Sequence, residues 1–164
     1  MFQPHDILIP MDLSNLNRQA LAVALRAVPA QGATLHLVHS VRGLGPALKR
    51  RIVSAPDETV IEDAIAADEA AMLAVLEDAL TELAEEGVSP MGPVKVDPTV
   101  VSTSLADACL ELCDEIDVDL IVAGTHGRLG AAWRPTVTER LVQDAPCSVV
   151  VVKPEGYPIL RDCA

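Results

Sequence analysis

Short apolar runs alternate with longer segments of helical periodicity along almost the whole chain. Runs rich in Val, Ile and Leu, bounded by polar or turn-forming residues, are typical of strands. The predicted strands are 7–10, 33–41, 94–101, 120–123 and 149–152. The segments between them place apolar residues three or four positions apart, which is typical of amphipathic helices. The predicted helices are 15–28, 57–86, 102–116 and 135–144.

This order of elements predicts a single α/β domain. Strands that alternate with helices form a parallel sheet with right-handed connections. The runs 7–10, 120–123 and 149–152 are continuously apolar, which indicates strands buried on both faces. Pro98 lies inside the third run, so we place that strand at an edge of the sheet. Ligands of such sheets bind beyond the carboxyl ends of strands where the strand order reverses, and we expect a site after the first and fourth strands.

The segment 43–56, between the second strand and the second helix, is a long excursion. It contains two glycines, two prolines and the basic run Lys49-Arg50-Arg51. Long excursions in small domains are often ligand flaps or partner surfaces. The basic run is therefore either a solvated surface or part of a mobile flap that brings cations near a bound phosphate.

Composition and charge exclude several classes of partner. The length of 164 residues suits one domain with one core. The net charge is −12, and 11 of the 24 acidic residues lie between Asp57 and Glu86, where there is no Lys or Arg. Nucleic acids need clustered cations, so no nucleic-acid partner is expected. No apolar run approaches the roughly 18 residues of a membrane span, and the N-terminus shows no signal-peptide pattern. We expect a cytoplasmic protein without membrane contact.

Metal and catalytic chemistry are not predicted. The four cysteines form no Cys-x-x-Cys pair and do not cluster with the four histidines in sequence. Buried, reduced thiols are the expected state, and no metal site is predicted. His126 has no serine, cysteine or acid beside it in a nucleophile pattern, so we assign it a structural or hydrogen-bonding role and predict no catalytic residue.

Two loops at predicted carboxyl ends of strands carry residues suited to a ligand. The first is Pro10-Met11-Asp12-Leu13-Ser14. The carboxylate of Asp12 can accept a hydrogen bond from a ribose hydroxyl or an adenine amine, or it can cap the next helix. The second loop, Gly124 to Gly130, has three glycines in seven residues. Glycines let backbone N–H groups approach a phosphate, and Thr136 at the next helix start adds a hydroxyl.

At these two loops the sequence resembles the universal stress protein family. The likeness covers nearly the whole chain and is strongest from Asp119 to Gly127. The resemblance implies a three-layer, Rossmann-like α/β sandwich with a five-stranded parallel sheet of order 3-2-1-4-5. It implies a domain at 1–154 followed by a C-terminal tail at 155–164. It also implies a homodimer formed through the last strand, 148–152. The other matching segments are 7–14, 37–41, 137–141 and 145–152.

Some members of this family bind ATP, and the binders share a glycine motif. That motif is Gly-x-x-Gly, nine residues, then Gly followed by Ser or Thr. Gly124 and Gly127 match its first half, whereas Pro135-Thr136 take the place of the second half after a spacer of seven residues. Proline has no N–H, so one phosphate donor is lost. The resemblance therefore implies an adenine nucleotide (ATP, ADP or AMP) held by a degenerate phosphate motif.

Three hypotheses of function follow. The first is a regulatory or protective protein that binds an adenine nucleotide without turnover. The second is a nucleotide-free dimeric interaction scaffold in the stress response, and the third is a slow ATP hydrolase. The matching Gly124 and Gly127 favour the first hypothesis, and the altered second half of the motif favours the scaffold. The contacts implied for a nucleotide are Pro10, Met11, Asp12, Ser40, Ala123, Gly124, Thr125, Gly127, Gly130, Thr136 and Val137.

Overall fold

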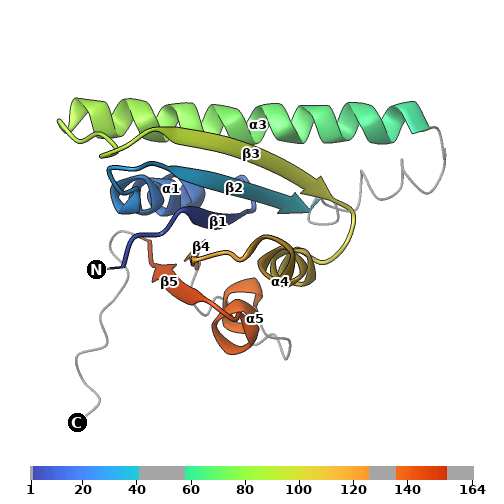
Figure 1. The fold of residues 1–164 in the computed structure, drawn as a ribbon. Coiled ribbons are helices and arrows are strands. Elements are labelled where there is room, and N and C mark those ends of the chain that lie inside the picture. Colours follow the sequence, from blue (N-terminus) through green and yellow to red (C-terminus); the bar gives the residue numbers. More distant parts are fainter. Residues whose placement is uncertain (1, 41–57, 126–135, 155–164) are drawn as a thin grey trace, which may run out of the picture.

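A five-stranded sheet forms the centre of the computed structural model, which describes residues 2–40, 58–125 and 136–154 (Figure 1). The strand order is β3-β2-β1-β4-β5, which confirms the expected order 3-2-1-4-5. Every neighbouring pair of strands is parallel. The strands are β1 (Asp6–Met11), β2 (Ala33–Ser40), β3 (Val94–Val101), β4 (Leu120–Gly124) and β5 (Ser148–Val152).

The sheet lies between two layers of helices. Helices α1 (Asn15–Ala27) and α3 (Glu58–Glu85) pack on one face. Helices α4 (Leu105–Ile116) and α5 (Val137–Asp144) pack on the other face. The chain therefore has the three-layer, Rossmann-like α/β architecture that the sequence predicted.

Strand β1 contributes to both halves of the core. Ile7, Ile9 and Met11 face α1 and α3, whereas Leu8 faces α4, and all four side chains are fully buried. Successive side chains of a strand point to opposite faces, so a strand between two helical layers is apolar at every position. Burying each such side chain stabilises the fold by about 1.5–3 kcal/mol.

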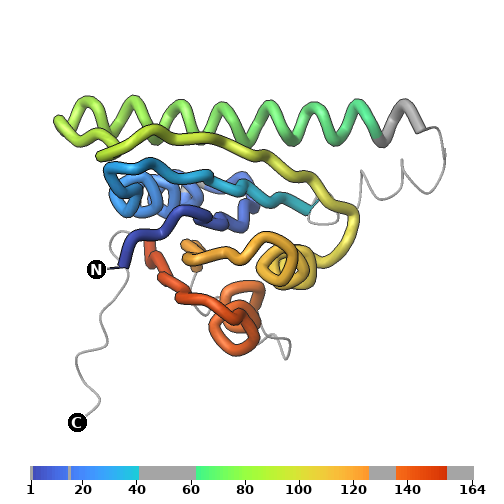
Figure 2. Tube along the Cα trace, viewed as in Figure 1, coloured from blue at the N-terminus to red at the C-terminus, as the bar shows by residue number. Residues whose placement is uncertain are grey.

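Helix α3 is anchored by one apolar stripe. Figure 2 shows α3 lying along β3 and extending past the carboxyl end of that strand. On its solvent side, Arg18 of α1 contacts Asp78 at 3.4 Å and Glu82 at 2.6 Å. The partners are exposed, so this pairing is worth at most about 1 kcal/mol and the stripe holds the helix. The buried residues of the stripe are Met72, Leu76, Ala79 and Leu83.

The ends of several elements differ from the predictions. Strand β3 has the predicted bounds and is an edge strand, which confirms the placement inferred from Pro98. Helix α4 begins at Leu105, because Ser104 keeps an extended backbone as its N-cap. Helix α5 begins at Val137 for the same reason, with Thr136 as N-cap. The excursion 43–56 and the tail 155–164 lie outside the described residues. Among the described helices, none has both the length and the apolarity to cross a bilayer.

Candidate functional site

The order in which the strands follow one another across the sheet reverses between β1 and β4. Strand β1 pairs with β2 on one side and with β4 on the other. The chain leaves β1 toward α1 on one face and leaves β4 toward α5 on the opposite face. In sheets of this kind ligands bind beyond the carboxyl ends of the two strands whose connections pass to opposite faces. The sequence predicted a ligand at this switch point.

The loop after β1 is held by its own polar groups. Asp12 Oδ1 accepts a hydrogen bond from the backbone N–H of Ser14 at 2.9 Å, which closes an Asx turn. Asn17 Oδ1 accepts from the backbone N–H of Asp12 at 3.0 Å, and Asn17 Nδ2 donates to the carbonyl of Pro10 at 3.3 Å. Asp12 thus braces the loop while its side chain stays exposed. Asn17 could not be predicted from the sequence as part of this loop, because its role depends on where the loop folds back.

Backbone strain marks the same loop. The backbone of Leu13 has φ +61, in the left-handed region that residues other than glycine and asparagine rarely adopt. Such strain costs about 1–3 kcal/mol and is often found where a loop is shaped for a ligand. Ser14 is the N-cap of α1 but makes no side-chain capping bond. Its buried Oγ has no hydrogen-bond partner in the part of the chain that the structure describes.

Pro10, Met11 and Ser40, which were predicted to contact the ligand, are all buried. The side chain of Met11 is fully buried in the core beneath α1 and α3. The hydroxyl of Ser40 is buried and donates to the carbonyl of Thr103 at 2.6 Å. That bond ties the end of β2 to the chain just before α4, so the Ser40 hydroxyl is already engaged.

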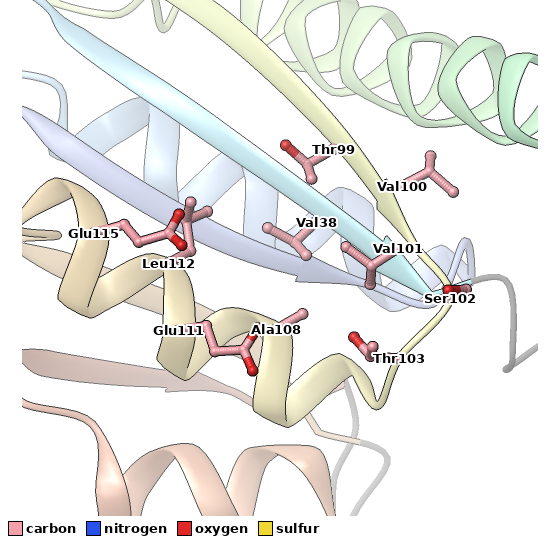
Figure 3. A pocket seen from close by; sticks show the side chains of 10 residues that line it. All are labelled: Val38, Thr99, Val100, Val101, Ser102, Thr103, Ala108, Glu111, Leu112 and Glu115. Carbon is pink, nitrogen blue, oxygen red and sulfur yellow. The ribbon is translucent and has the colours of Figure 1, made fainter.

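A cavity of about 420 Å³ lies beside this bond, between β2, β3 and α4. Figure 3 shows Val38 and Val101 of the strands on one side and Leu112 of α4 on the other. Glu111 and Glu115 line the helix side. The acidic lining distinguishes this cavity from a phosphate site, which needs donors rather than carboxylates.

Gly124, at the end of β4, has a structural reason to be glycine. A Cβ at this position would lie 2.8 Å from Cγ and 3.0 Å from Cδ2 of Leu16 on α1. The carbonyl of Gly124 accepts from Thr138 Oγ1 at 2.9 Å, and the N–H of Thr125 donates to the carbonyl of Val152 at 3.0 Å. Ala123 is buried in the core beneath α4. The backbone N–H of Thr125 therefore belongs to the β4–β5 pairing.

The start of α5 carries a complete capping box. Thr136 Oγ1 accepts from the N–H of Glu139 at 3.2 Å, and Glu139 Oε2 accepts from the N–H of Thr136 at 2.8 Å. Helix geometry leaves the first-turn N–H groups of Val137 and Thr138 without an intrahelical acceptor. These two groups can receive an anion, although the Glu139 carboxylate already places negative charge at the helix start.

Arg140 of α5 forms an ion pair with another residue of the protein. Arg140 donates to Asp107 of α4 at 2.7 Å. The hydrogen bond from Arg140, joined by one from Ser104, holds the pKa of Asp107 below its usual range. This exposed ion pair links α4 to α5 and directs the Arg140 guanidinium toward a carboxylate of the protein itself.

The cysteines are placed for packing. Cys109 and Cys113 lie on the buried face of α4. Burial is the main cause that raises the pKa of each thiol to about 12. Burial also raises the pKa of the partly exposed Cys147. Thiols of this kind stay protonated and unreactive at neutral pH. Over the described ranges, no three His, Cys, Asp or Glu side chains are grouped as metal ligands.

Several predicted residues lie outside the described part of the chain. These are His126, Gly127, Gly130, Pro135 and the flap segment 43–56. The described residues bring the Asp12 loop, Gly124, Thr125 and the start of α5 to the carboxyl ends of β1 and β4. A carboxylate at one end and helix N–H groups at the other suit a polar ligand with both hydroxyl and anionic groups.

The fold defines a class of protein: a doubly wound α/β domain whose strand order reverses between β1 and β4. The profile of the universal stress protein family matches residues 4–153. This chain therefore belongs to the universal stress protein family.

Solved structures of similar fold include the hypothetical protein MJ0577, which is 22% identical over 95% of this chain and 99% of that one, with a TM-score of 0.62. A universal stress protein in complex with cAMP is 20% identical over 92% and 97%, with a TM-score of 0.56. An Arabidopsis thaliana universal stress protein family protein with AMP bound is 17% identical over 93% and 94%, with a TM-score of 0.53. No curated protein matches the chain.

Proposed function

We propose that this protein binds an adenine nucleotide at the carboxyl ends of β1 and β4 and acts as a regulatory or protective protein. The braced, strained loop at Asp12 is the observation that carries the proposal, because it presents an exposed carboxylate from a fixed backbone at the switch point. Family membership supports it, and two related proteins were solved with cAMP and with AMP.

Each end of the nucleotide has a proposed contact. Asp12 accepts from a ribose hydroxyl, and the backbone at Ser40 lies beside the base. The phosphate meets the N–H groups of Val137 and Thr138 and the glycine loop that begins at Gly124. Pro135 removes one donor, and the Glu139 carboxylate repels additional negative charge. AMP and ADP therefore bind nearly as well as ATP.

Calorimetric titration with AMP, ADP and ATP tests this proposal. Asp12→Ala weakens binding about tenfold or more, the size expected for a lost hydrogen bond to a charged group. The matched control is Asp63→Ala, which removes an exposed acid on α3. Gly127→Val also weakens binding. Absence of binding at millimolar concentration contradicts the proposal, and ATP binding a hundredfold tighter than AMP contradicts the degenerate motif.

We propose binding without turnover. The proposed contacts are one carboxylate, backbone N–H groups and hydroxyls, and none of these forms a nucleophile–base pair. Incubation of the protein with ATP should release phosphate no faster than incubation of Asp12→Ala. Phosphate release that depends on Asp12 contradicts this part of the proposal and favours the slow hydrolase.

We propose that the protein forms a homodimer through β5. This strand is an edge of the sheet, and Val150 and Val151 are each 39% exposed on it. Val142 of the neighbouring α5 is 56% exposed. Pairing of β5 with its counterpart in a second copy satisfies backbone groups and covers these side chains. Light scattering should report a dimer at micromolar concentration and a monomer for Val151→Pro. A wild-type monomer, or a dimer unaffected by the proline, contradicts the interface.

The nucleotide-free scaffold is the alternative, and the packing of Gly124 against Leu16 favours it. This contact explains one motif glycine without a ligand. Protein purified without added nucleotide and then denatured distinguishes the two proposals. Released adenine nucleotide supports the binding protein, and its absence together with a flat titration supports the scaffold.

A further inference from the structure

One histidine at the end of β2 is buried beside the candidate site. His39 is 3% exposed and lies on the same face of the sheet as Leu35 and Leu37, toward α1 and α3. Its Nδ1 lies 2.7 Å from the backbone carbonyl oxygen of Met11 on the neighbouring β1. A carbonyl oxygen only accepts, so Nδ1 carries the hydrogen and donates it to Met11.

The other side of the His39 ring faces an acid on α3. Asp68 is 7% exposed, and its Oδ2 lies 3.5 Å from His39 Nε2. Both atoms are buried, and neither has a hydrogen-bond partner within the described residues. Buried polar atoms are nearly always paired in native proteins. A hydrogen bond between His39 Nε2 and Asp68 Oδ2 would join α3 to the imidazole ring while Nδ1 stays bonded to the Met11 carbonyl.

The contacted carbonyl belongs to the peptide that begins the Asp12 loop. The carbonyl of Met11 accepts from His39, and the N–H of the same peptide, on Asp12, donates to Asn17 Oδ1 at 3.0 Å. Both ends of one peptide plane are therefore held, one from β2 and one from α1. The next residue, Leu13, is the one with the strained backbone. A peptide held at both ends cannot rotate to relieve that strain without breaking a buried bond.

We propose that His39 and Asp68 are positioning residues of the nucleotide site: Asp68 orients the His39 ring, and His39 fixes the Met11–Asp12 peptide so that the Asp12 carboxylate faces the ligand. The inference rests on the proposed function. It assigns nucleotide affinity to a residue of α3, outside the loops that follow β1 and β4. By linkage, a bound nucleotide in turn stabilises the contact between α3 and β2.

Four variants of the full-length protein test the pair. His39→Phe removes the donor to Met11, whereas His39→Asn keeps an N–H near the Nδ1 position and loses the reach to Asp68. Asp68→Leu removes the acid, and Asp63→Leu is the control on an exposed position of the same helix. The first readout is calorimetric titration with AMP. The second, which needs no ligand, is hydrogen exchange at the Asp12 amide compared with the Val122 amide in the core.

We expect His39→Phe and Asp68→Leu to weaken AMP binding about tenfold and to speed exchange at Asp12 more than at Val122, because a fixed hydrogen bond is lost. His39→Asn retains more affinity than His39→Phe. Wild-type affinity and wild-type exchange in both variants overturn the proposal. Equal acceleration at both amides also overturns it, because that result shows general destabilisation. If the wild-type protein binds no nucleotide while Asp12 exchange still responds selectively, the proposed function fails, and only the fixing of the Met11–Asp12 peptide by His39 and Asp68 stands.

Discussion

Replacing Gly124 with alanine tests whether this motif glycine has a packing role. The new Cβ would lie 2.8 Å from Leu16 Cγ and 3.0 Å from Cδ2, whereas carbon atoms in contact prefer about 3.5–4.0 Å. Leu16 is 7% exposed and cannot move aside into solvent. It must therefore shift by about 0.5–1.2 Å within a packed core. Overpacking of this kind costs about 1–3 kcal/mol.

Urea unfolding of a double-mutant cycle measures this cost. Leu16→Ala alone leaves a cavity and loses about 2–5 kcal/mol. The combined variant lets the added Cβ occupy part of that cavity, so its loss should be smaller than the sum of the single losses by at least about 1 kcal/mol. A Gly124→Ala variant that loses less than about 0.5 kcal/mol refutes the reasoning. Additive losses in the double variant refute it as well.

Three further variants or treatments probe the elements around the site. Thr136→Ala should lower the free energy of unfolding by about 1 kcal/mol and Thr136→Ser by much less, because the capping box needs a hydroxyl. Equal losses in the two variants contradict the role of the hydroxyl. Arg18→Ala should lose less than about 1 kcal/mol, because its partners are exposed. Iodoacetamide at pH 8 should modify Cys109 and Cys113 in urea but not in the folded protein. Because burial raises the pKa of both thiols from 9.0 to about 12, their contribution to stability is constant below pH 9.0 and is lost between pH 9.0 and about 12, where only the unfolded thiols ionise.

Strands β1 and β4 were predictable because burial on two faces leaves a strong mark in sequence. The same interpretation was wrong for 149–152, because β5 is an edge strand on which Val150 and Val151 are exposed. The apolar run 7–11 of β1, which lies between polar neighbours, has few other interpretations. Pro98 located an edge because proline disturbs a central strand. The start of α4 was predicted three residues early, since Ser102, Thr103 and Ser104 all suit an N-cap and only the observed backbone of Ser104 selects one.

The finer geometry of the site was not predictable, because it depends on contacts between distant segments. His39 reaches a carbonyl 28 positions away, and Ser40 reaches one 63 positions away. Those pairings follow from strand order and register rather than from any local pattern. The sequence allows Asp12 to be either a ligand contact or a brace, and the structure shows that it braces the loop while its side chain stays exposed.

Pro98 has a consequence for how copies of this chain add to one another. A sheet with two open edges can recruit a copy at each and grow into a filament. In β3 the proline supplies no N–H, and a strand that docks against that edge would find a donor missing midway along it. If copies of the chain pair through β5 as proposed, the two-fold axis uses both β5 edges, and Pro98 disfavours addition of a further strand at β3.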